Sequence, residues 1–148
     1  MPIDRDNPDK YPPNIQAILK RPAAAAVVLG QELIDVDKEA GTVRVAYNAT
    51  ETLANRFGAI HGGMTAAMLD DVISLAAGLS IEWGQITPTL EMKVSYIAQG
   101  RPGTRIQAEA RTIRRGGTVI FLEADLKDET GKLLATASST VMIAQMKK

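Results

Sequence analysis

Hydrophobic and polar residues alternate with two different periods along this chain. Around residues 43–47 apolar and polar side chains change places at every step, which is typical of a strand with one buried face. Between Gly63 and Leu79 the apolar residues recur instead at the spacing of a helix, and no proline interrupts them. The apolar face of this predicted helix holds Met64, Met68, Val72, Leu75 and Leu79. Because the rest of its surface is also largely apolar, we expect the helix to be buried.

After Thr87 the alternation of strands returns and continues almost to the end of the chain. Turn-forming segments separate the apolar stretches, at residues 100–103, 116–117 and 128–131. The pattern predicts four strands, at residues 90–96, 105–111, 120–126 and 133–143. Tight turns between consecutive strands indicate antiparallel pairing.

The first part of the chain is less regular. Residues 1–13 contain four prolines and several charges, which predicts an extended or poorly ordered arm. Asn14 is placed to cap a short helix over residues 15–20, which Pro22 would end. The apolar-rich residues 24–36 suit a strand. We therefore divide the chain into an arm with a short helix at residues 1–23 and a single domain at residues 24–148.

The order of these elements predicts the fold class. A short helix, two strands, one long helix and four strands give an α+β protein with one antiparallel sheet. One face of that sheet must be covered by something apolar, and the long helix is the only candidate. We expect the sheet to curl around this helix. Because one helix cannot cover a wide sheet alone, we also expect the protein to form homo-oligomers.

Composition narrows the classes of protein that fit. A length of 148 residues suggests one domain, and the absence of cysteine excludes disulfides, zinc–thiolate sites and cysteine nucleophiles. Seventeen basic and seventeen acidic residues cancel, which argues against bulk electrostatic binding of nucleic acid. The polar start lacks the apolar core of a signal peptide, and no apolar run reaches the ~18 residues of a membrane span. We expect a cytoplasmic protein without a membrane partner.

Residues that can do chemistry gather near the predicted start of the long helix. The group consists of Asn55, His61, Gly62, Gly63 and Asp70. His61 is the only histidine, and Asp70 follows it by nine residues. The first N–H groups of a helix lack partners within the helix, so they can bind an anion or a developing oxyanion. A carboxylate two to three turns further on can then take part in a reaction.

Two adjacent acids compete for that role. A carboxylate inside an apolar helix is costly unless it is paired or functional. Asp70 and Asp71 project about 100° apart, so only one of them can face a given pocket.

These residues lie in a longer pattern that resembles a known family. The pattern comprises Asn55, Gly58, His61-Gly62-Gly63 and Asp70, followed by segments at Thr89–Tyr96, Gly103–Ile106 and Asp128–Ala135. It is similar to the hotdog fold, and more specifically to acyl-CoA thioesterases of the PaaI type in the 4-hydroxybenzoyl-CoA thioesterase superfamily. The resemblance covers roughly residues 24–143.

The resemblance implies an enzyme that hydrolyses an acyl-CoA thioester to a free acid and coenzyme A. It implies that Asp70 is the nucleophile or the general base, with Asp71 left as a salt-bridge or surface residue. The N–H of Gly62 or Gly63 would stabilise the oxyanion. In family dimers the acid faces the other subunit, so a dimer or a dimer of dimers is implied. Supporting roles fall to Asn55 for positioning the carbonyl or the water, Thr89 for holding the water, and His61 for orienting the turn or polarising the carbonyl.

Coenzyme A enters as part of the substrate, and neither a metal nor a separate cofactor is expected. Arg101, Arg114, Arg115 and Gly116 are the candidates for binding coenzyme A, because guanidinium groups suit phosphates. Solvated turn charges and a plain hairpin turn are equally good explanations for them. Trp83 is expected in the core. Two other functions stay open, a non-catalytic acyl-CoA sensor and a hotdog dehydratase.

Overall fold

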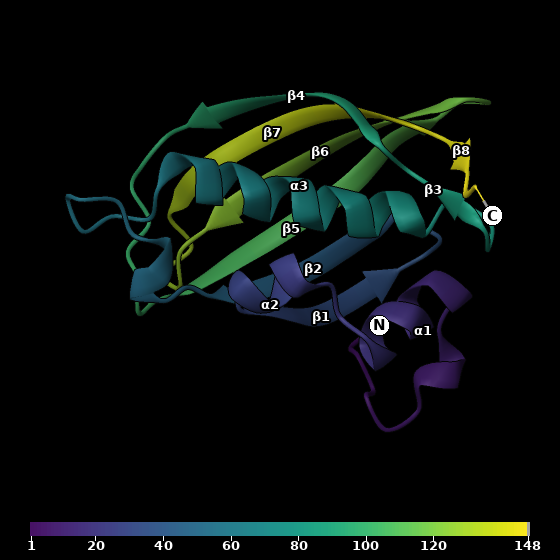
Figure 1. Ribbon diagram of the computed structural model, residues 1–148, viewed down its shortest axis with the longest axis horizontal. Coiled ribbons are helices and arrows are strands. Elements are labelled where there is room, and N and C mark those ends of the chain that lie inside the picture. The colour runs from purple at the N-terminus through teal and green to yellow at the C-terminus, as the bar shows by residue number, and fades with distance from the viewer. Residues whose placement is uncertain (148) are drawn as a thin grey trace.

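The computed structural model describes residues 1–147, and its centre is one long helix, α3 (Gly62–Gly78), lying in the curl of an antiparallel sheet (Figure 1). Six strands form this sheet: β1 (Gln31–Asp37), β2 (Thr42–Asn48), β4 (Thr89–Tyr96), β5 (Arg105–Arg115), β6 (Val119–Lys127) and β7 (Leu133–Met142). Their order in space is β1-β2-β5-β6-β7-β4. The predicted α+β architecture, an antiparallel sheet wrapped around one helix, is confirmed.

Helix α3 supplies much of the core. It contacts β2, β5 and β6 most closely, and its buried residues are Met68, Leu69, Val72, Ile73, Leu75, Ala76 and Ala77. They meet the inward side chains of the strands, such as Tyr47, Leu122 and Val141, each at most 1% exposed. Burial of this apolar surface is the main force that holds the helix in place. Within residues 1–147 we find no helix long and apolar enough to cross a membrane.

Residues 24–36 do not form one strand, and that prediction is wrong. They divide into helix α2 (Ala24–Val28) and strand β1, with Gly30 between them at φ +69°. Periodicity cannot distinguish a short apolar helix from a short apolar strand, which explains the error. Val27 is 63% exposed, so α2 adds an exposed apolar surface beside β1 rather than a further strand.

The amino-terminal segment is more ordered than the prolines predicted. It contains a 3₁₀ helix, η1 (Pro8–Lys10), and the N–H of Ile3 donates to the carbonyl of Ile34, so the segment lies along the outer edge of β1. Helix α1 (Pro13–Lys20) begins one residue before the predicted cap. Asn14 instead donates its amide to the carbonyl of Gly78 at 3.1 Å, which ties α1 to the end of α3.

Strand β4 forms the other edge of the sheet and contains an irregularity. Thr89 pairs with Val141 and Glu91 pairs with Thr140, so Leu90 is an extra residue between them. Such a bulge reverses which side chains point inward. Strict alternation would turn Leu90 toward α3, but the bulge turns Thr89 there instead.

A small second sheet joins the segment after α3 to the end of the chain. Strand β3 (Gln85–Ile86) pairs with β8 (Ala144–Gln145). Before the start of α3 the chain forms another 3₁₀ helix, η2 (Glu51–Leu53). Trp83 lies just before β3 and is 68% exposed, so its predicted place in the core is wrong.

Gly30 offers a test of the turn from α2 into β1. A Cβ atom at this position would lie 2.5 Å from the carbonyl oxygen of Asn48, and its positive φ is unfavourable for other residues. We expect Gly30→Ala to lower the free energy of unfolding by about 1–3 kcal/mol, measured by urea denaturation. Gly117→Ala is the matched control, because a Cβ there meets nothing within 4 Å. Equal stability of the two variants would contradict this account.

Candidate active site

The loop before α3 is held in one shape by Asn55. Its side-chain oxygen accepts the N–H of Phe57 at 2.9 Å and the N–H of Ala59 at 3.2 Å. Its backbone N–H donates to the carbonyl of Ala59, and Gly58 supplies the positive φ of +81° that this turn requires. Because backbone donors occupy the oxygen of Asn55, only its NH₂ group is left to reach a ligand.

His61 caps helix α3. Its Nδ1 accepts the N–H of Gly63 at 3.0 Å, which satisfies one of the unpaired donors at the helix start. An imidazole nitrogen that accepts a hydrogen bond carries no proton, so a neutral His61 carries its proton on Nε2. The side chain is exposed, and Nε2–H is therefore a donor available to a ligand.

The cap decides which glycine can stabilise an oxyanion. Sequence alone left Gly62 and Gly63 as equal candidates. The N–H of Gly63 is engaged by His61, whereas the N–H of Gly62, the first residue of the helix, has no partner within residues 1–147. The free amide at the positive end of α3 is thus that of Gly62.

Tyr96 contacts the same glycine through its carbonyl and was missed by the sequence interpretation. Its hydroxyl donates to the carbonyl of Gly62 at 3.0 Å, from the end of β4. A hollow opens here, lined among others by Asn55, Gly62, Thr65 and Tyr96. The available signal was the place of Tyr96 on the inward face of β4, two positions beyond Val94.

Asp70 and Thr89 are brought together as a pair. The Thr89 hydroxyl donates to Oδ1 of Asp70 at 2.8 Å, which leaves Oδ2 of this partly exposed carboxylate without a donor among residues 1–147. The contact depends on the bulge in β4, because only the bulge turns Thr89 toward α3.

Asp71 is not the surface or salt-bridge residue that the sequence suggested. Its Oδ2 lies 2.6 Å from the Tyr47 hydroxyl and accepts a hydrogen bond from Nε2 of Gln31, also at 2.6 Å. Burial raises the pKa of Asp71 above its usual range. Burial likewise raises the pKa of Tyr47 well above 10, so Tyr47 keeps its proton. The two adjacent acids therefore face different sides of α3.

The two halves of the candidate site lie far apart within one chain. Eight residues separate Gly62 from Asp70 along α3, and a helix rises 1.5 Å per residue, so about 12 Å separate them along its axis. A single carbonyl group cannot contact the Gly62 amide and the Asp70 carboxylate of the same chain.

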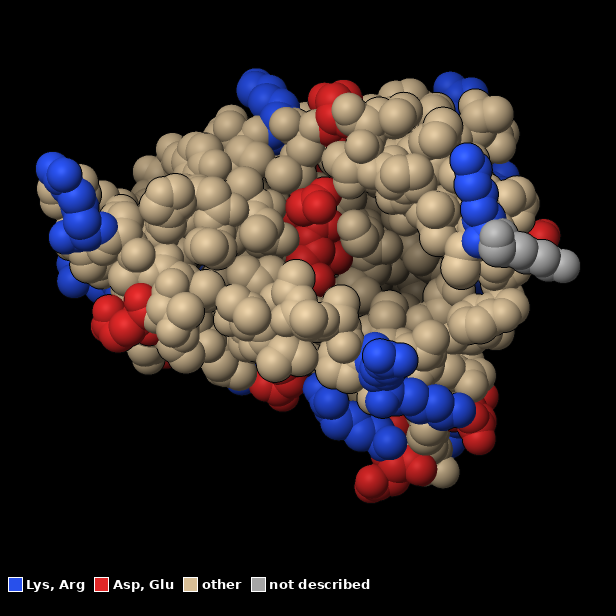
Figure 2. Space-filling model, in the orientation of Figure 1, with Lys and Arg blue, Asp and Glu red and all other residues tan. Residues whose placement is uncertain are grey.

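The exposed face over α3 is almost free of charge. Figure 2 shows acidic atoms in the middle of this face, beside a hollow, with uncharged residues around them. Asp70 and Asp71 are the only charged residues of α3. A largely uncharged surface around one carboxylate suits an apolar contact, either with a ligand or with another chain.

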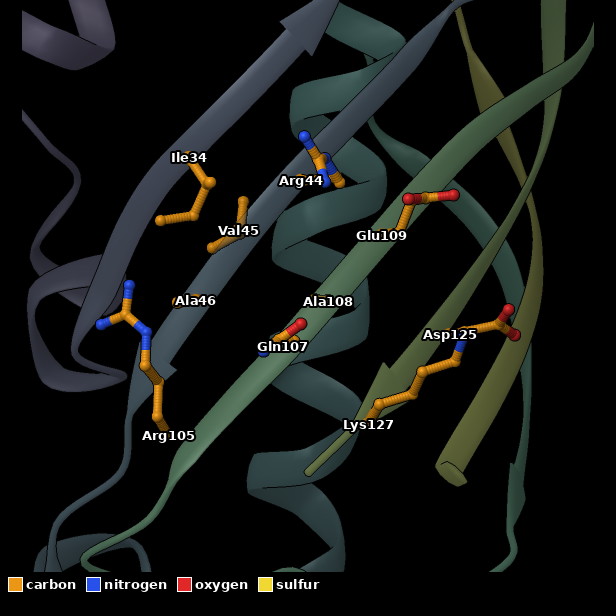
Figure 3. A pocket seen from close by; sticks show the side chains of 10 residues that line it. All are labelled: Ile34, Arg44, Val45, Ala46, Arg105, Gln107, Ala108, Glu109, Asp125 and Lys127. Carbon is orange, nitrogen blue, oxygen red and sulfur yellow. The ribbon is translucent and has the colours of Figure 1, made fainter. Parts of the chain in front are cut away.

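A further hollow lies on the outer face of the sheet and is not part of this site. Its walls come from β1, β2, β5 and β6, with α3 behind them (Figure 3). Side chains of both charges line it, including Arg44, Arg105, Glu109 and Lys127.

The four candidates for binding coenzyme A do not lie together in one chain. Arg101 follows Gly100, whose carbonyl accepts the N–H of Ile60, so Arg101 is near the start of α3. Arg115 donates to the carbonyl of Ser80, beyond the other end of α3. Arg114 precedes it, and Gly116 forms the hairpin turn by donating its N–H to Val119.

Comparison with known proteins agrees with this fold. The model of the thioesterase superfamily matches residues 57–135. The chain belongs to the thioesterase superfamily. The resemblance to hotdog thioesterases of the PaaI type is thereby confirmed, and the protein is a thioester hydrolase.

Three relatives illustrate how far the likeness extends. The 1,4-dihydroxy-2-naphthoyl-CoA hydrolase of Listeria monocytogenes is 30% identical, over 81% of this chain and 95% of its own. Human acyl-coenzyme A thioesterase 13 is 31% identical, over 76% of this chain and 80% of its own. A solved phenylacetic acid degradation-related protein of Ralstonia eutropha is 36% identical, with a TM-score of 0.79. The match covers 85% of this chain and 96% of the Ralstonia chain.

The cap made by His61 can be tested apart from any catalytic role. We expect His61→Ala to lower the free energy of unfolding by about 1 kcal/mol, because Gly63 loses its acceptor. Asparagine is among the best capping residues, so His61→Asn should remain close to wild type in the same urea titration. A loss of stability that is the same in both variants would mean that the cap contributes nothing.

Proposed function

We propose that this protein hydrolyses acyl-CoA thioesters to a free acid and coenzyme A, in a site that two copies of the chain complete together. The names of the Listeria and human relatives, both acting on coenzyme A thioesters, support this substrate class. The observation that carries the shared site is the separation of about 12 Å between Gly62 and Asp70 along one helix. A second copy can bring its own Gly62 to the first copy's Asp70.

The reaction begins at the free oxygen of Asp70. Thr89 holds Oδ1, so Oδ2 either attacks the thioester carbonyl carbon or takes a proton from a water that attacks it. Direct attack gives an acyl–Asp70 anhydride, which water then hydrolyses. In both routes the C–S bond breaks, and the thiolate of coenzyme A leaves and takes up a proton.

The partner's helix start would stabilise the negative charge on the carbonyl oxygen. The Gly62 N–H is unpaired and points from the positive end of α3, which favours a developing oxyanion. The NH₂ group of Asn55 and the Nε2–H of His61 are further donors beside it. Asn55 and His61 thus orient the substrate, while Gly62 and Asp70 act on the reacting atoms.

The open edge of β4 gives the second copy its place. Residues of the amino-terminal segment cover the outer edge of β1, whereas β4 pairs only with β7. A long unpaired edge strand favours pairing with another chain. Antiparallel pairing of two β4 strands lays the Thr89 end of one beside the Tyr96 end of the other, which is where the two halves of the site reside.

Charge favours one register for this pairing. With the two-fold axis at Met92, Glu91 lies opposite the partner's Lys93, and the reverse, so two opposite-charge pairs form across the strands. With the axis at Lys93, two lysines would oppose each other.

The same arrangement bears on coenzyme A. Arg101 of one chain is on the side of the oxyanion donors, and Arg114 and Arg115 are at the opposite end of α3. In an antiparallel dimer the opposite ends of the two chains lie side by side, so one phosphate chain can meet arginines from both. Arg114 is the better candidate of the hairpin pair, because Arg115 is engaged with Ser80 and Gly116.

The proposed activity is tested by releasing free thiol from a panel of short, long and aromatic acyl-CoA thioesters. We expect Asp70→Asn to lower kcat by about 10²–10⁴-fold while the protein stays folded, because the neutral amide neither attacks nor takes a proton. Binding of acyl-CoA without turnover of any panel member would replace the enzyme proposal with that of a sensor.

Gly62→Pro tests the oxyanion donor directly. Proline is well tolerated at the first position of a helix and lacks an N–H, so this change deletes the donor and keeps the fold. We expect kcat to fall about 10²–10³-fold. Gly62→Ala is the control, because it retains the N–H and its Cβ makes only ordinary contact with Tyr96 at 3.5 Å. Full activity of the proline variant would exclude this donor.

The Gly62→Pro and Asp70→Asn variants, combined in one dimer, test whether two chains share the site. Mixing unfolded Gly62→Pro and Asp70→Asn chains and refolding them would give mixed dimers with one intact site. We expect such mixtures to regain about a quarter of wild-type activity, although neither variant alone is active. No recovery, in a preparation that gel filtration shows to be dimeric, would place the whole site within one chain.

A further inference from the structure

A polar network lies on the side of α3 that faces away from β4. The Tyr47 hydroxyl is within 2.8 Å of the carbonyl oxygen of Met68 and within 2.6 Å of Oδ2 of Asp71. Gln31 donates to the same Oδ2 at 2.6 Å. Tyr47 is fully buried. None of these side chains takes part in the reaction described above.

The number of hydrogens available in this network bears on whether Asp71 is protonated. A tyrosine hydroxyl has one hydrogen, but here its oxygen lies at hydrogen-bond distance from two acceptor oxygens, those of Met68 and Asp71. With Asp71 ionised, one of these two contacts would lack a hydrogen. If Asp71 is protonated, Asp71 donates to Tyr47 and Tyr47 donates to Met68. Gln31 can still donate to the oxygen of the carboxyl group, so every contact is satisfied.

We propose that Asp71 is a positioning residue that carries a proton and, in this neutral form, joins α3 to β1 and β2 in the rotation that aims Asp70 at Thr89. The proposal rests on the proposed function only in giving Asp70 the reacting role. The proton on Asp71 is a separate claim, which can be tested on a protein without any substrate.

The geometry explains how one residue can orient its neighbour. Consecutive side chains of a helix project about 100° apart, so the direction of Asp71 fixes that of Asp70. Asp71 contacts two strands on one side of α3 through Gln31 and Tyr47, and Asp70 contacts β4 on another side through Thr89. A turn of the helix about its axis would break hydrogen bonds on both sides.

A neutral Asp71 also keeps a second negative charge away from Asp70. The titratable groups that face Asp71 are Tyr47 from β2 and Asp70 from its own helix, and α2 has no titratable side chain. Burial raises the pKa of Asp71, and the charge of Asp70 acts in the same direction. The folded protein therefore binds this proton more tightly than the unfolded chain does. The resulting stability is complete below pH 3.8 and is lost as the pH rises through the raised pKa.

Three variants separate the proton from the packing. Asp71→Asn mimics the protonated acid, because its oxygen accepts and its NH₂ donates. Asp71→Leu fills similar space without polar atoms, and Tyr47→Phe removes the hydroxyl. The measurements are stability against pH by urea denaturation, the ¹³C chemical shift of the Asp71 carboxyl group against pH, and the pH profile of kcat/KM.

We expect Asp71→Asn to retain activity and to lack the Asp71 contribution to the pH dependence of stability. The difference in unfolding free energy between wild type and this variant should therefore fall as the pH rises above 3.8. Its kcat/KM should keep the pH profile of wild type. Asp71→Leu and Tyr47→Phe should lower kcat about 10–100-fold with little change in KM, because Asp70 is no longer aimed. Rescue by asparagine but not by leucine would be the signature of positioning by a neutral group.

Other outcomes overturn the proposal. An Asp71 carboxyl group that titrates at or below pH 3.8 would show that it carries no unusual proton. A loss of kcat in Asp71→Asn equal to that in Asp71→Leu would show that the charge itself is needed. If wild type hydrolyses no thioester, the proposed function fails, and the ¹³C titration and the stability curves still decide whether Asp71 holds a proton.

Discussion

The packing of α3 into the curl of the sheet is the constraint on which the other features depend. Seven buried residues between Met68 and Ala77 meet the inward faces of β2, β5 and β6. This contact fixes both the depth and the rotation of the helix. Since the amide of Gly62 and the carboxylate of Asp70 are parts of the same helix, their directions are fixed with it. The apolar core thus acts directly on the geometry of the chemistry.

Three polar contacts restrict the position and rotation of α3 more closely than apolar packing does. His61 closes the helix start, Thr89 meets Asp70 on the side of β4, and Asp71 joins Tyr47 on the opposite side. Apolar side chains slide past one another at little cost, whereas a buried hydrogen bond fails when its partners move by a fraction of its length. The helix is therefore held at its end and on two sides, around the residues proposed to carry out the reaction.

The sequence predicted the sheet, the long helix and the residues Asn55, His61 and Asp70, because periodicity and a short motif determine them. It mistook residues 24–36 for one strand, since five apolar residues fit a helix as well. It gave equal weight to both glycines, and it placed Asp71 at the surface. Both of these depend on contacts between residues distant in sequence. Tyr47 and Gln31 form hydrogen bonds with Asp71 and precede it by 24 and 40 residues.

Thr89 shows a subtler limit. Alternation along β4 predicts that Leu90 and Met92 share a face, and under that rule Thr89 would point outward. The bulge opposite Val141 turns Thr89 inward instead, and no local pattern in the sequence predicts this bulge. Bulges often re-aim one side chain beside an active site. Here the irregularity is the reason that a hydroxyl meets the Asp70 carboxylate at all.

The single histidine also determines which N–H group is free at the start of α3. By accepting the N–H of Gly63, His61 removes one of two neighbouring donors and leaves that of Gly62 free. Tyr96 holds the carbonyl of Gly62 from β4, which restrains the peptide group that follows the free donor. A helix start normally exposes several unpaired N–H groups, each of which can bind an anion. The His61 cap leaves the N–H of Gly62 free, and the distance of this donor from Asp70 along the helix is the reason for proposing that a second chain completes the site.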